Sequence, residues 1–284
     1  MALDPYALAT VANFRAQTGI AAATLPDARV EYFIEAASAL IETWCRRQFA
    51  ARDYREFLDG PGGQWLVLRS PLLRVDRVVV ERTAGLSVAY ALANSSQATL
   101  SVSDDGTELR LESVVSGASA TTTLDLDAAA NDPLTDLATV ITAVAGWTAT
   151  AITAQAQVPS SDLWPVSGLN CLNVTSHLEV MQGVVTDYRV EFGEGMLYGS
   201  WGRSPKSTCV FYRAGYDAIP DDLAYACIEV GKRAYQESER DSTLTGERLG
   251  PYSWNRFTGL GSPLADDIQR ILVGYKDYAL LTGV

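Results

Sequence analysis

Few residues in this chain of 284 amino acids have the type and spacing that catalysis needs. His177 is the only histidine, and it lies in the strand-like stretch NVTSHLEV. A serine or cysteine nucleophile would need that imidazole as its base, and no GxSxG nucleophile elbow occurs in the sequence. We therefore interpret His177 as a surface or packing residue and predict that no residue is catalytic.

The cysteines are equally poor candidates for chemistry, because they share no short spacing. They are Cys45, Cys171, Cys209 and Cys227. A zinc site draws three or four nitrogen or sulfur ligands together, and a redox site needs a CxxC pair. The sequence predicts no metal site, no bound cofactor and no disulfide framework, which is typical of a protein made in a reducing, cytoplasmic compartment.

Three pairs of adjacent aspartates could act as general acids and bases or as magnesium ligands. They are Asp104-Asp105, Asp221-Asp222 and Asp266-Asp267. The first pair falls in a predicted turn. The other two fall in the first turns of predicted helices, where the helix dipole favours a carboxylate. The stretch 199–207 is similar to a phosphate-binding loop, but Pro205 stands where such a loop has glycine before its lysine. We interpret all of these features as structural.

Aromatic side chains in one glycine-rich segment are stronger candidates for function. Residues 240–262 show no apolar period, and the segment is longer than a routine helix connection. Its aromatic rings must therefore pack either on the rest of the chain or on a partner. Aromatic residues beside arginine are typical of binding hot spots. We predict an extended arm that docks on a neighbouring protein, with the partner-binding residues Arg248, Tyr252, Trp254, Arg256 and Phe257.

The charge distribution separates the middle of the chain from its ends. The net charge is −12, and residues 84–161 carry eight acidic side chains and one basic one, Arg110. The same stretch is rich in alanine, threonine and serine, and such a shift in composition indicates a separately built module. Proteins that read nucleic-acid sequence need a basic surface to neutralise phosphates, so the acidic balance excludes that class.

The two ends of the chain are predicted to be largely helical. Asp4 is typical of a helix start and Gly19 of a helix stop. Apolar residues that recur at i, i+3, i+4 and i+7 predict helices at 4–19, 27–48, 220–238 and 263–278. Short β-type runs lie between them, at 54–58, 65–68, 75–80, 170–175, 184–192 and 208–213.

The middle of the chain follows a different pattern. Alternating apolar residues on both sides of Asp104-Asp105-Gly106 predict a hairpin. A strand at 121–126, a helix from Asp132 to Gly146 and a strand at 147–152 then form a βαβ-like pattern. The predicted class is α+β: a helical core with a small antiparallel β portion, plus an inserted small α/β domain.

No targeting or membrane signal is found in the sequence. The first residues, MALDPYALAT, lack the basic start and apolar core of a signal peptide. The longest uncharged run, 137–161, is interrupted by threonines, Gly146 and Pro159, which is typical of a helix followed by a strand rather than a bilayer span.

Four segments in order resemble the head–tail connector (adaptor) proteins of tailed bacteriophages. They are YFIEAASALIETWCRRQF (32–49), REFLDGPGGQWLVLRSPLLRVDRVVV (55–80), VFYRAGYDAIPDDLAYACIEVGKRAY (210–235) and ERLGPYSW (247–254). The resemblance covers about 1–83 and 186–284 and leaves out the middle. It implies three parts: a first part of the adaptor core (1–83), an inserted acidic module (84–185), and a second part of the core (186–284) that carries the arm.

The resemblance implies a structural virion protein rather than an enzyme. Adaptors form a ring, usually of twelve copies, between the portal protein and the tail or a stopper protein. Double-stranded DNA passes through the ring without sequence recognition, and an acidic channel suits that passage. We therefore expect a protein made in the host cytoplasm and located at the head–tail junction, with no membrane partner. Ring contacts are expected from helices 27–48 and 220–238 packed side by side.

Two other function classes remain open from the sequence. One is a tail or baseplate component whose middle module binds carbohydrate or the host. The other is a hydrolase with a shallow polar site. An adaptor would stay with emptied, tailless heads on particle fractionation, whereas a tail component would not, and substitution of His177 would test the hydrolase.

Overall fold

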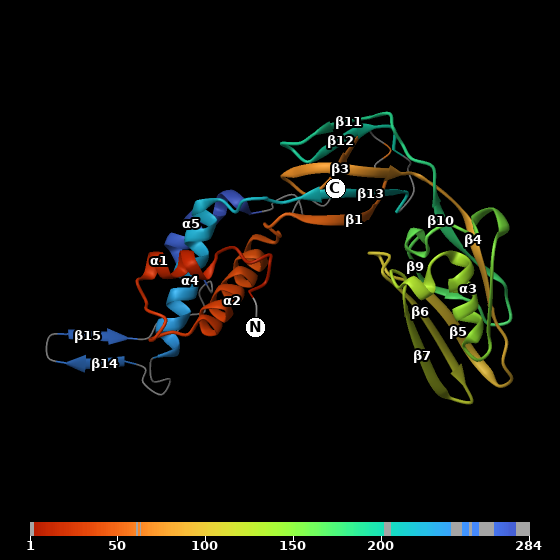
Figure 1. Cartoon of the computed structure of the whole chain (residues 1–284), viewed down its shortest axis with the longest axis horizontal. Coiled ribbons are helices and arrows are strands. Elements are labelled where there is room, and N and C mark those ends of the chain that lie inside the picture. Colours follow the sequence, from red (N-terminus) through yellow and green to blue (C-terminus); the bar gives the residue numbers. More distant parts are fainter. Residues whose placement is uncertain are drawn as a thin grey trace. The chain divides into compact units, whose positions relative to one another are not determined.

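The computed structural model describes residues 3–60, 62, 64–201, 206–239, 246–249, 252–255 and 264–276. The chain divides into two compact units (Figure 1). A helical unit combines Met1–Arg52 with Gly215–Val284, and a strand unit is formed by Asp53–Ala214. The two ends of the chain therefore fold together, and the strand unit is inserted between them.

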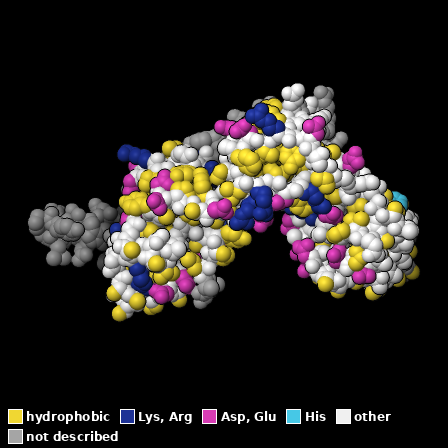
Figure 2. All heavy atoms as spheres, turned by 45° about the horizontal axis from the view of Figure 1, so that its top comes forward, with side chains coloured by type: hydrophobic (Ala, Val, Ile, Leu, Met, Phe, Trp, Pro, Cys, Tyr) yellow, Lys and Arg dark blue, Asp and Glu magenta, His cyan; other side chains and the backbone are white. Residues whose placement is uncertain are grey.

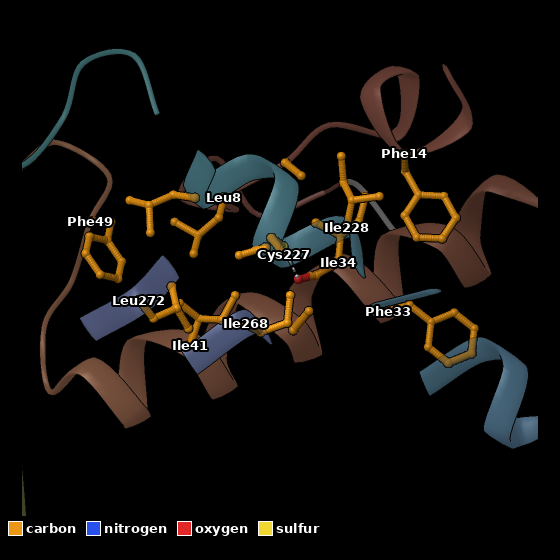
Figure 3. Close-up of a cluster of buried hydrophobic side chains, with 14 of the residues drawn as sticks. Leu8, Phe14, Phe33, Ile34, Ile41, Phe49, Cys227, Ile228, Ile268 and Leu272 are labelled. Carbon is orange, nitrogen blue, oxygen red and sulfur yellow. Dashed lines mark hydrogen bonds between the residues drawn. The ribbon is translucent and has the colours of Figure 1, made fainter. Parts of the chain in front are cut away.

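Four α-helices build the described part of the helical unit. They are α1 (Val11–Thr18), α2 (Asp27–Cys45), α4 (Asp221–Ser238) and α5 (Asp266–Leu272), followed by a 3-10 turn at Val273–Tyr275. Figure 3 shows the core, where side chains of α2, α4 and α5 point toward one another. Its fully buried members include Leu8, Phe14, Ile34, Ile41, Phe49, Cys227, Ile268 and Leu272. Burial of each such leucine or isoleucine contributes about 1.5–3 kcal/mol, so this core holds the separated ends of the chain together.

The predicted apolar stripe of α2 is confirmed, and its one polar member is satisfied. Ser38 lies on the buried face, where its hydroxyl donates to the Ile34 carbonyl at 2.8 Å and accepts the Leu8 N–H at 3.0 Å. A buried polar group with both bonds made does not weaken the core. In the part of the chain that the structure describes, none of the helices combines the length and apolar character that a bilayer crossing requires.

The ends of the helices follow local capping chemistry. The hydroxyl of Thr10 accepts the Asn13 N–H at 3.1 Å, so α1 begins at Val11 and not near Asp4 as predicted. Asp4 instead accepts the Tyr6 N–H at 2.8 Å in a separate turn. Gly19 ends α1 as predicted, with a φ of 69° that glycine adopts without strain. The last residues of the predicted helix 263–278 lie outside the described part of the chain.

Two three-stranded antiparallel sheets form one part of the strand unit. The first has the order β1–β13–β3 (Arg52–Leu58, Thr208–Ala214, Leu72–Val79), and the second has the order β11–β12–β2 (Tyr188–Glu191, Met196–Gly199, Trp65–Val67). They share a core that includes Leu66, Leu72, Val78, Leu197, Trp201, Val210 and Tyr212. Strand β13 lies between β1 and β3, so segments more than a hundred residues apart form one sheet.

Two further sheets and one helix form the middle part of the strand unit. The sheets are β10–β4–β8 (Ser176–Gln182, Glu81–Tyr90, Trp147–Ala151) and β7–β6–β5–β9 (Ala118–Asp125, Glu108–Val115, Ser95–Val102, Val166–Asn170). Helix α3 (Leu134–Ala143) buries Leu134, Leu137 and Ile141 in their core. Short 3-10 turns lie at Ala129–Asn131, Thr153–Gln155 and Ser160–Asp162. The predicted hairpin around Gly106 is confirmed as the β5–β6 connection.

The predicted mixture of helices and strands is present, but a helical core with a small β portion is wrong. Within the described residues, fifteen strands accompany five α-helices. Strand β4 shows why the strands were underestimated. Its sequence, ERTAGLSVAY, is rich in small and polar residues with weak strand propensity, and pairing with β10 and β8 on both sides stabilises it.

The predicted βαβ-like arrangement of the middle is also wrong. Strands β7 and β8, which flank α3, belong to different sheets, and β8 pairs antiparallel with β4. Gly146, with a φ of 84°, turns the chain from α3 directly into β8, and Trp147 then pairs with Tyr90. The pairs β10–β4, β11–β12, β12–β2, β13–β3, β14–β15, β4–β8, β5–β6, β5–β9 and β6–β7 are all antiparallel.

The two ends of the predicted insertion 84–185 lie side by side, as expected for an inserted segment. Arg82 pairs with Met181 in the β4–β10 ladder, and the Val185 N–H donates to the Val78 carbonyl at 2.8 Å. The middle also contacts the β1–β13–β3 sheet. Trp164 packs on Phe57 with ring centroids 5.0 Å apart. Whether 84–185 folds independently stays a prediction.

Candidate partner-binding surface

The residues that the sequence singled out for acid–base chemistry lie on different elements and make separate structural contacts. His177 is exposed on β10, opposite Ser87 in the ladder. Asp105 lies in the β5–β6 turn, where hydrogen bonds from Ser103 and from Thr107 hold its pKa below the usual value. Asp267 lies in the first turn of α5 and pairs with Arg233 of α4 at 2.6 Å. Within the described residues, no group of three or more histidine, cysteine or acidic side chains is arranged to hold a metal ion.

The four cysteines are buried and unpaired as disulfides. Burial raises the pKa of Cys45, of Cys171 and of Cys227 to about 11. Burial likewise raises the pKa of Cys209 to about 12. Since a thiolate is the reactive form, these thiols are poor nucleophiles at neutral pH.

The predicted arm contains a hairpin rather than a continuous loop. Strands β14 (Gly246–Leu249) and β15 (Tyr252–Asn255) pair antiparallel. Three of the predicted partner-binding residues lie in it: Arg248 pairs with Ser253, Trp254 with Glu247, and Tyr252 with Leu249. Arg256 and Phe257 lie outside the described residues. The role of this arm in binding stays a prediction.

A surface that sequence reasoning missed lies on the β11–β12–β2 sheet. Trp65 of β2 pairs with Tyr198 of β12, and Tyr198 pairs in turn with Arg189 of β11. Two positions along, on the same face, Val67 pairs with Met196. Trp65, Val67 and Tyr198 are 52%, 47% and 40% exposed. These five residues form what we call the aromatic face. Figure 2 shows hydrophobic side chains gathered on the upper middle of the surface, where Figure 1 places β11 and β12.

The alternation of the strands places these side chains outward. Successive residues of a strand point to opposite faces of its sheet. In β2 and β12 the intervening residues, Leu66 and Leu197, are buried in the core shared with the β1–β13–β3 sheet. Strands β2 and β12 therefore carry apolar side chains on both faces of the sheet. Apolar side chains that are exposed next to one another are typical of interaction sites. Trp, Tyr and Arg are also the residue types that dominate binding hot spots.

A half-buried polar network lies beside the end of β2. Arg69, just after β2, donates from Nε to Glu56 of β1 at 2.7 Å, and its guanidinium lies 4.7 Å from the ring centroid of Tyr54. Tyr212 of β13 donates its hydroxyl to the other oxygen of Glu56. Burial, with the nearby Glu56 carboxylate, raises the pKa of Tyr212 well above its usual value, so the phenol remains the donor. The aromatic face thus rests on a preorganised support.

Arg189 has the freedom to engage a partner. Its side chain is 80% exposed, and its contact with Glu191 is a surface pair 3.8 Å apart. Such exposed pairs contribute little and exchange readily for a contact with a bound protein. Together with Trp65 and Tyr198, Arg189 gives the aromatic face one row of three hot-spot residue types across three strands.

The sequence contains a signal for this surface, but the signal can be interpreted only once the pairing of the strands is known. A strand with one solvated face should alternate apolar with polar residues. The runs WLV (65–67) and MLYG (196–199) instead have apolar or aromatic residues at successive positions, so both faces of each strand carry them. Only the cross-strand register brings Trp65 and Tyr198 together, because 132 positions separate them in the chain.

No model of a known protein family matches the sequence, and no curated protein is significantly similar to it.

Proposed function

We propose that this protein is a structural component of a tailed-phage virion. It forms a ring at the head–tail junction, between the portal protein and the tail or stopper protein, and performs no catalysis. The proposal rests on the resemblance of four sequence segments to adaptor proteins and on the way the chain presents its aromatic face.

The folding of the separated segments supports the resemblance. The adaptor-like stretches at 1–83 and 186–284 are far apart in sequence, yet β13 from the second lies between β1 and β3 from the first. Helices α2 and α4, which carry two of the four resembling segments, also share one core. In each of the two units, then, the first and the second adaptor-like stretch fold together, as an adaptor interrupted by an insertion requires.

The contact between copies in the ring is assigned to the aromatic face. We expected helices 27–48 and 220–238 to make this contact, but their apolar stripes are buried against each other within one subunit. Exposed tyrosines occur on these helices too, Tyr32 on α2 and Tyr225 on α4, but Trp65, Tyr198 and Arg189 lie together in one row across three strands. A ring closes through heterologous contacts, so this face binds a different surface of the neighbouring copy. This exposed row of anchors is the observation that carries the proposal.

The net negative charge of the chain is compatible with DNA passing through the ring. A net charge of −12 disfavours lasting contact with the phosphates of double-stranded DNA that passes through a ring. The portal protein and the tail or stopper protein would then be bound through surfaces above and below the ring.

The test is assembly on the portal protein of the same phage, measured by native mass spectrometry. The intact protein should add several copies to each portal ring. Trp65→Ala should lower assembly by about 2 kcal/mol or more, which is about 30-fold in the association constant. Leu92→Ala is the matched control, since Leu92 is similarly exposed at 45% but lies outside the aromatic face.

Two results would contradict the proposal. One is a Trp65→Ala protein that assembles as well as the intact chain. The other is a particle fractionation in which the protein leaves with the tails instead of staying with emptied, tailless heads.

A further inference from the structure

The open edge of strand β7 is a second surface that could meet a partner. Strand β7 is the outermost of the β7–β6–β5–β9 sheet, and β6 is its one neighbouring strand among the described residues (Figure 1). It is eight residues long, and Ala118–Thr121 are all exposed. No described element covers its outer side.

The ladder shows which backbone groups are free. The Leu126 N–H donates to the Thr107 carbonyl at 2.7 Å, which continues the β6–β7 register by one pair. Antiparallel pairs alternate between bonded and non-bonded, so the even-numbered residues of β7 bond to β6. The N–H and C=O groups of Ser119, Thr121 and Thr123 therefore point away from the sheet.

The edge of β7 lacks the features by which proteins protect such strands. Natural sheets protect an edge with proline, lysine, a bulge or a covering element, because free backbone groups recruit other strands. Residues 118–124 contain no proline and no charged side chain, and the β6–β7 register has no shift. The edge strand β10 differs, since it has a shift between Leu178 and Glu179.

Strand β8 shows how the same fold protects an equally uncharged edge. The Ile152 N–H donates to the Gly85 carbonyl, so the even-numbered residues of β8 form the bonded pairs with β4. The backbone groups of Ala149 therefore point away from β4. The hydroxyl of Thr142 on α3 accepts the Ala149 N–H at 3.0 Å and lies 3.3 Å from its carbonyl oxygen. Thr142 thus occupies the position that an added strand would take at β8. The described residues offer no such group to β7.

The charge around β7 indicates the chemistry of the partner. Residues 84–161 carry eight acidic side chains and one arginine, Arg110, which is already paired with Glu112 at 2.6 Å. Both lie on β6, and Asp125 ends β7. A second copy of this edge would bring like charges together, which opposes pairing between copies. A cationic strand would be attracted.

We propose that the β7 edge binds an extended peptide segment, rich in lysine or arginine, of another protein by taking it up as a fifth antiparallel or parallel strand. The backbone of Ser119, Thr121 and Thr123 supplies the hydrogen bonds, as in other cases of strand addition. Cationic side chains of the peptide lie on the solvent face near Glu108 and Glu112. Its alternate residues are small or apolar, because they continue the face on which Leu124 packs against the core. The proposal is independent of ring formation through the aromatic face.

The experiment uses the full chain and a synthetic peptide of alternating lysine and valine with the length of β7. Binding is followed by NMR and by hydrogen exchange of the β7 amides. The peptide should slow exchange at Ser119, Thr121 and Thr123, and leave the even-numbered amides unchanged. A peptide of alternating glutamate and valine should bind at least about tenfold more weakly, because its charge is repelled.

Two variants separate backbone recognition from side-chain recognition. Thr121→Pro removes one outward N–H without breaking the β6–β7 ladder, so it should abolish binding while circular dichroism stays unchanged. Thr121→Val keeps the N–H and should bind like the intact chain. A lysine–valine peptide methylated on the backbone nitrogens that face β7 should fail to bind the intact chain, which tests the same bonds without altering the protein.

Three outcomes would overturn the proposal. The first is slow exchange of Thr121 in the free monomer, which would mean that the edge is already covered. The second is equal binding of the lysine and glutamate peptides. The third is concentration-dependent dimerisation that protects the β7 amides, which would identify a second copy as the occupant.

Discussion

The aromatic face and the β7 edge offer two opposite kinds of recognition within one strand-rich unit. The aromatic face presents side chains, with Trp65 and Tyr198 paired across neighbouring strands. The β7 edge presents free backbone groups, and its side chains are mostly small and polar. The first surface should therefore be sensitive to the identity of single residues, and the second to whether the backbone can donate.

The largest expected effect is the contrast between alanine substitutions on the two surfaces. Trp65→Ala should weaken assembly on the portal by about 2 kcal/mol or more, because it removes a central aromatic anchor. Thr121→Ala should leave binding of the lysine–valine peptide within about twofold, because the backbone N–H is retained. The measurements are native mass spectrometry and peptide titration. Equal sensitivity of both surfaces to alanine would remove the distinction.

The second prediction concerns the support below the aromatic face. Glu56→Ala should lower the free energy of unfolding by about 2 kcal/mol, because it leaves the buried Tyr212 hydroxyl and Arg69 without their acceptor. Assembly on the portal should weaken with it, since β2 loses its anchor. Chemical denaturation measures the first effect.

Asp53→Ala is the matched control for this support. Asp53 also lies on β1 and pairs with two arginines, Arg74 at 3.4 Å and Arg213 at 3.2 Å. Its side chain is 66% exposed, so the loss should stay below about 1 kcal/mol. If the two substitutions cost the same, the network of Glu56 has no special role in holding β2.

The difference between the surfaces also explains what could be predicted from the sequence. The helix α2 was placed correctly, because a periodic apolar stripe depends on neighbours three and four residues away. The aromatic face and the strand β4 depend on partners that are distant in the chain, such as Tyr198 for Trp65. Single-sequence patterns contain little information about such pairing, so they predict too little β structure and place the ring contact on helices 27–48 and 220–238 instead of on the aromatic face.

In the middle of the chain, too, the order of the elements could be predicted but the pairing of the strands could not. The strand–helix–strand order around α3 was read correctly, but the pairing was not, because order along the chain does not fix which sheet a strand joins. The turn at Gly146 and the pairing of Tyr90 with Trp147 decide it. Composition and charge, by contrast, identified the acidic stretch that surrounds the β7 edge without any knowledge of the fold.

The third prediction uses pH to act on the support of the aromatic face and not on β7. Because the pKa of Tyr212 is raised in the folded state, the unfolded chain releases this proton first, at a pH near the usual value of about 10. Stability from this phenol is complete below that pH and falls as the pH rises above it. Tyr212→Phe should therefore flatten the decline of the unfolding free energy between about pH 10 and 11.5.

The comparison between the two curves matters, because the buried thiols contribute to the same decline. Their pKa values are raised too, so both proteins should lose stability in alkali. Only the difference between intact protein and variant reports Tyr212. Parallel curves across this range would show that the phenol does not titrate with unfolding.

The smallest expected effect tests why β7 is open and β8 is not. Thr142→Val keeps the shape of the side chain but removes the hydroxyl that accepts the Ala149 N–H. The free energy of unfolding should fall by only about 1 kcal/mol, because one hydrogen bond is exchanged for one to water. The Ala149 amide should then exchange with solvent faster, while the β7 amides keep their rates. If protection by Thr142 is what closes this edge, the lysine–valine peptide should gain a second, weaker site at β8 in the variant. Unchanged exchange at Ala149 would show that helix α3 itself, and not the hydroxyl, covers β8, and the contrast with β7 would then rest on packing rather than on one hydrogen bond.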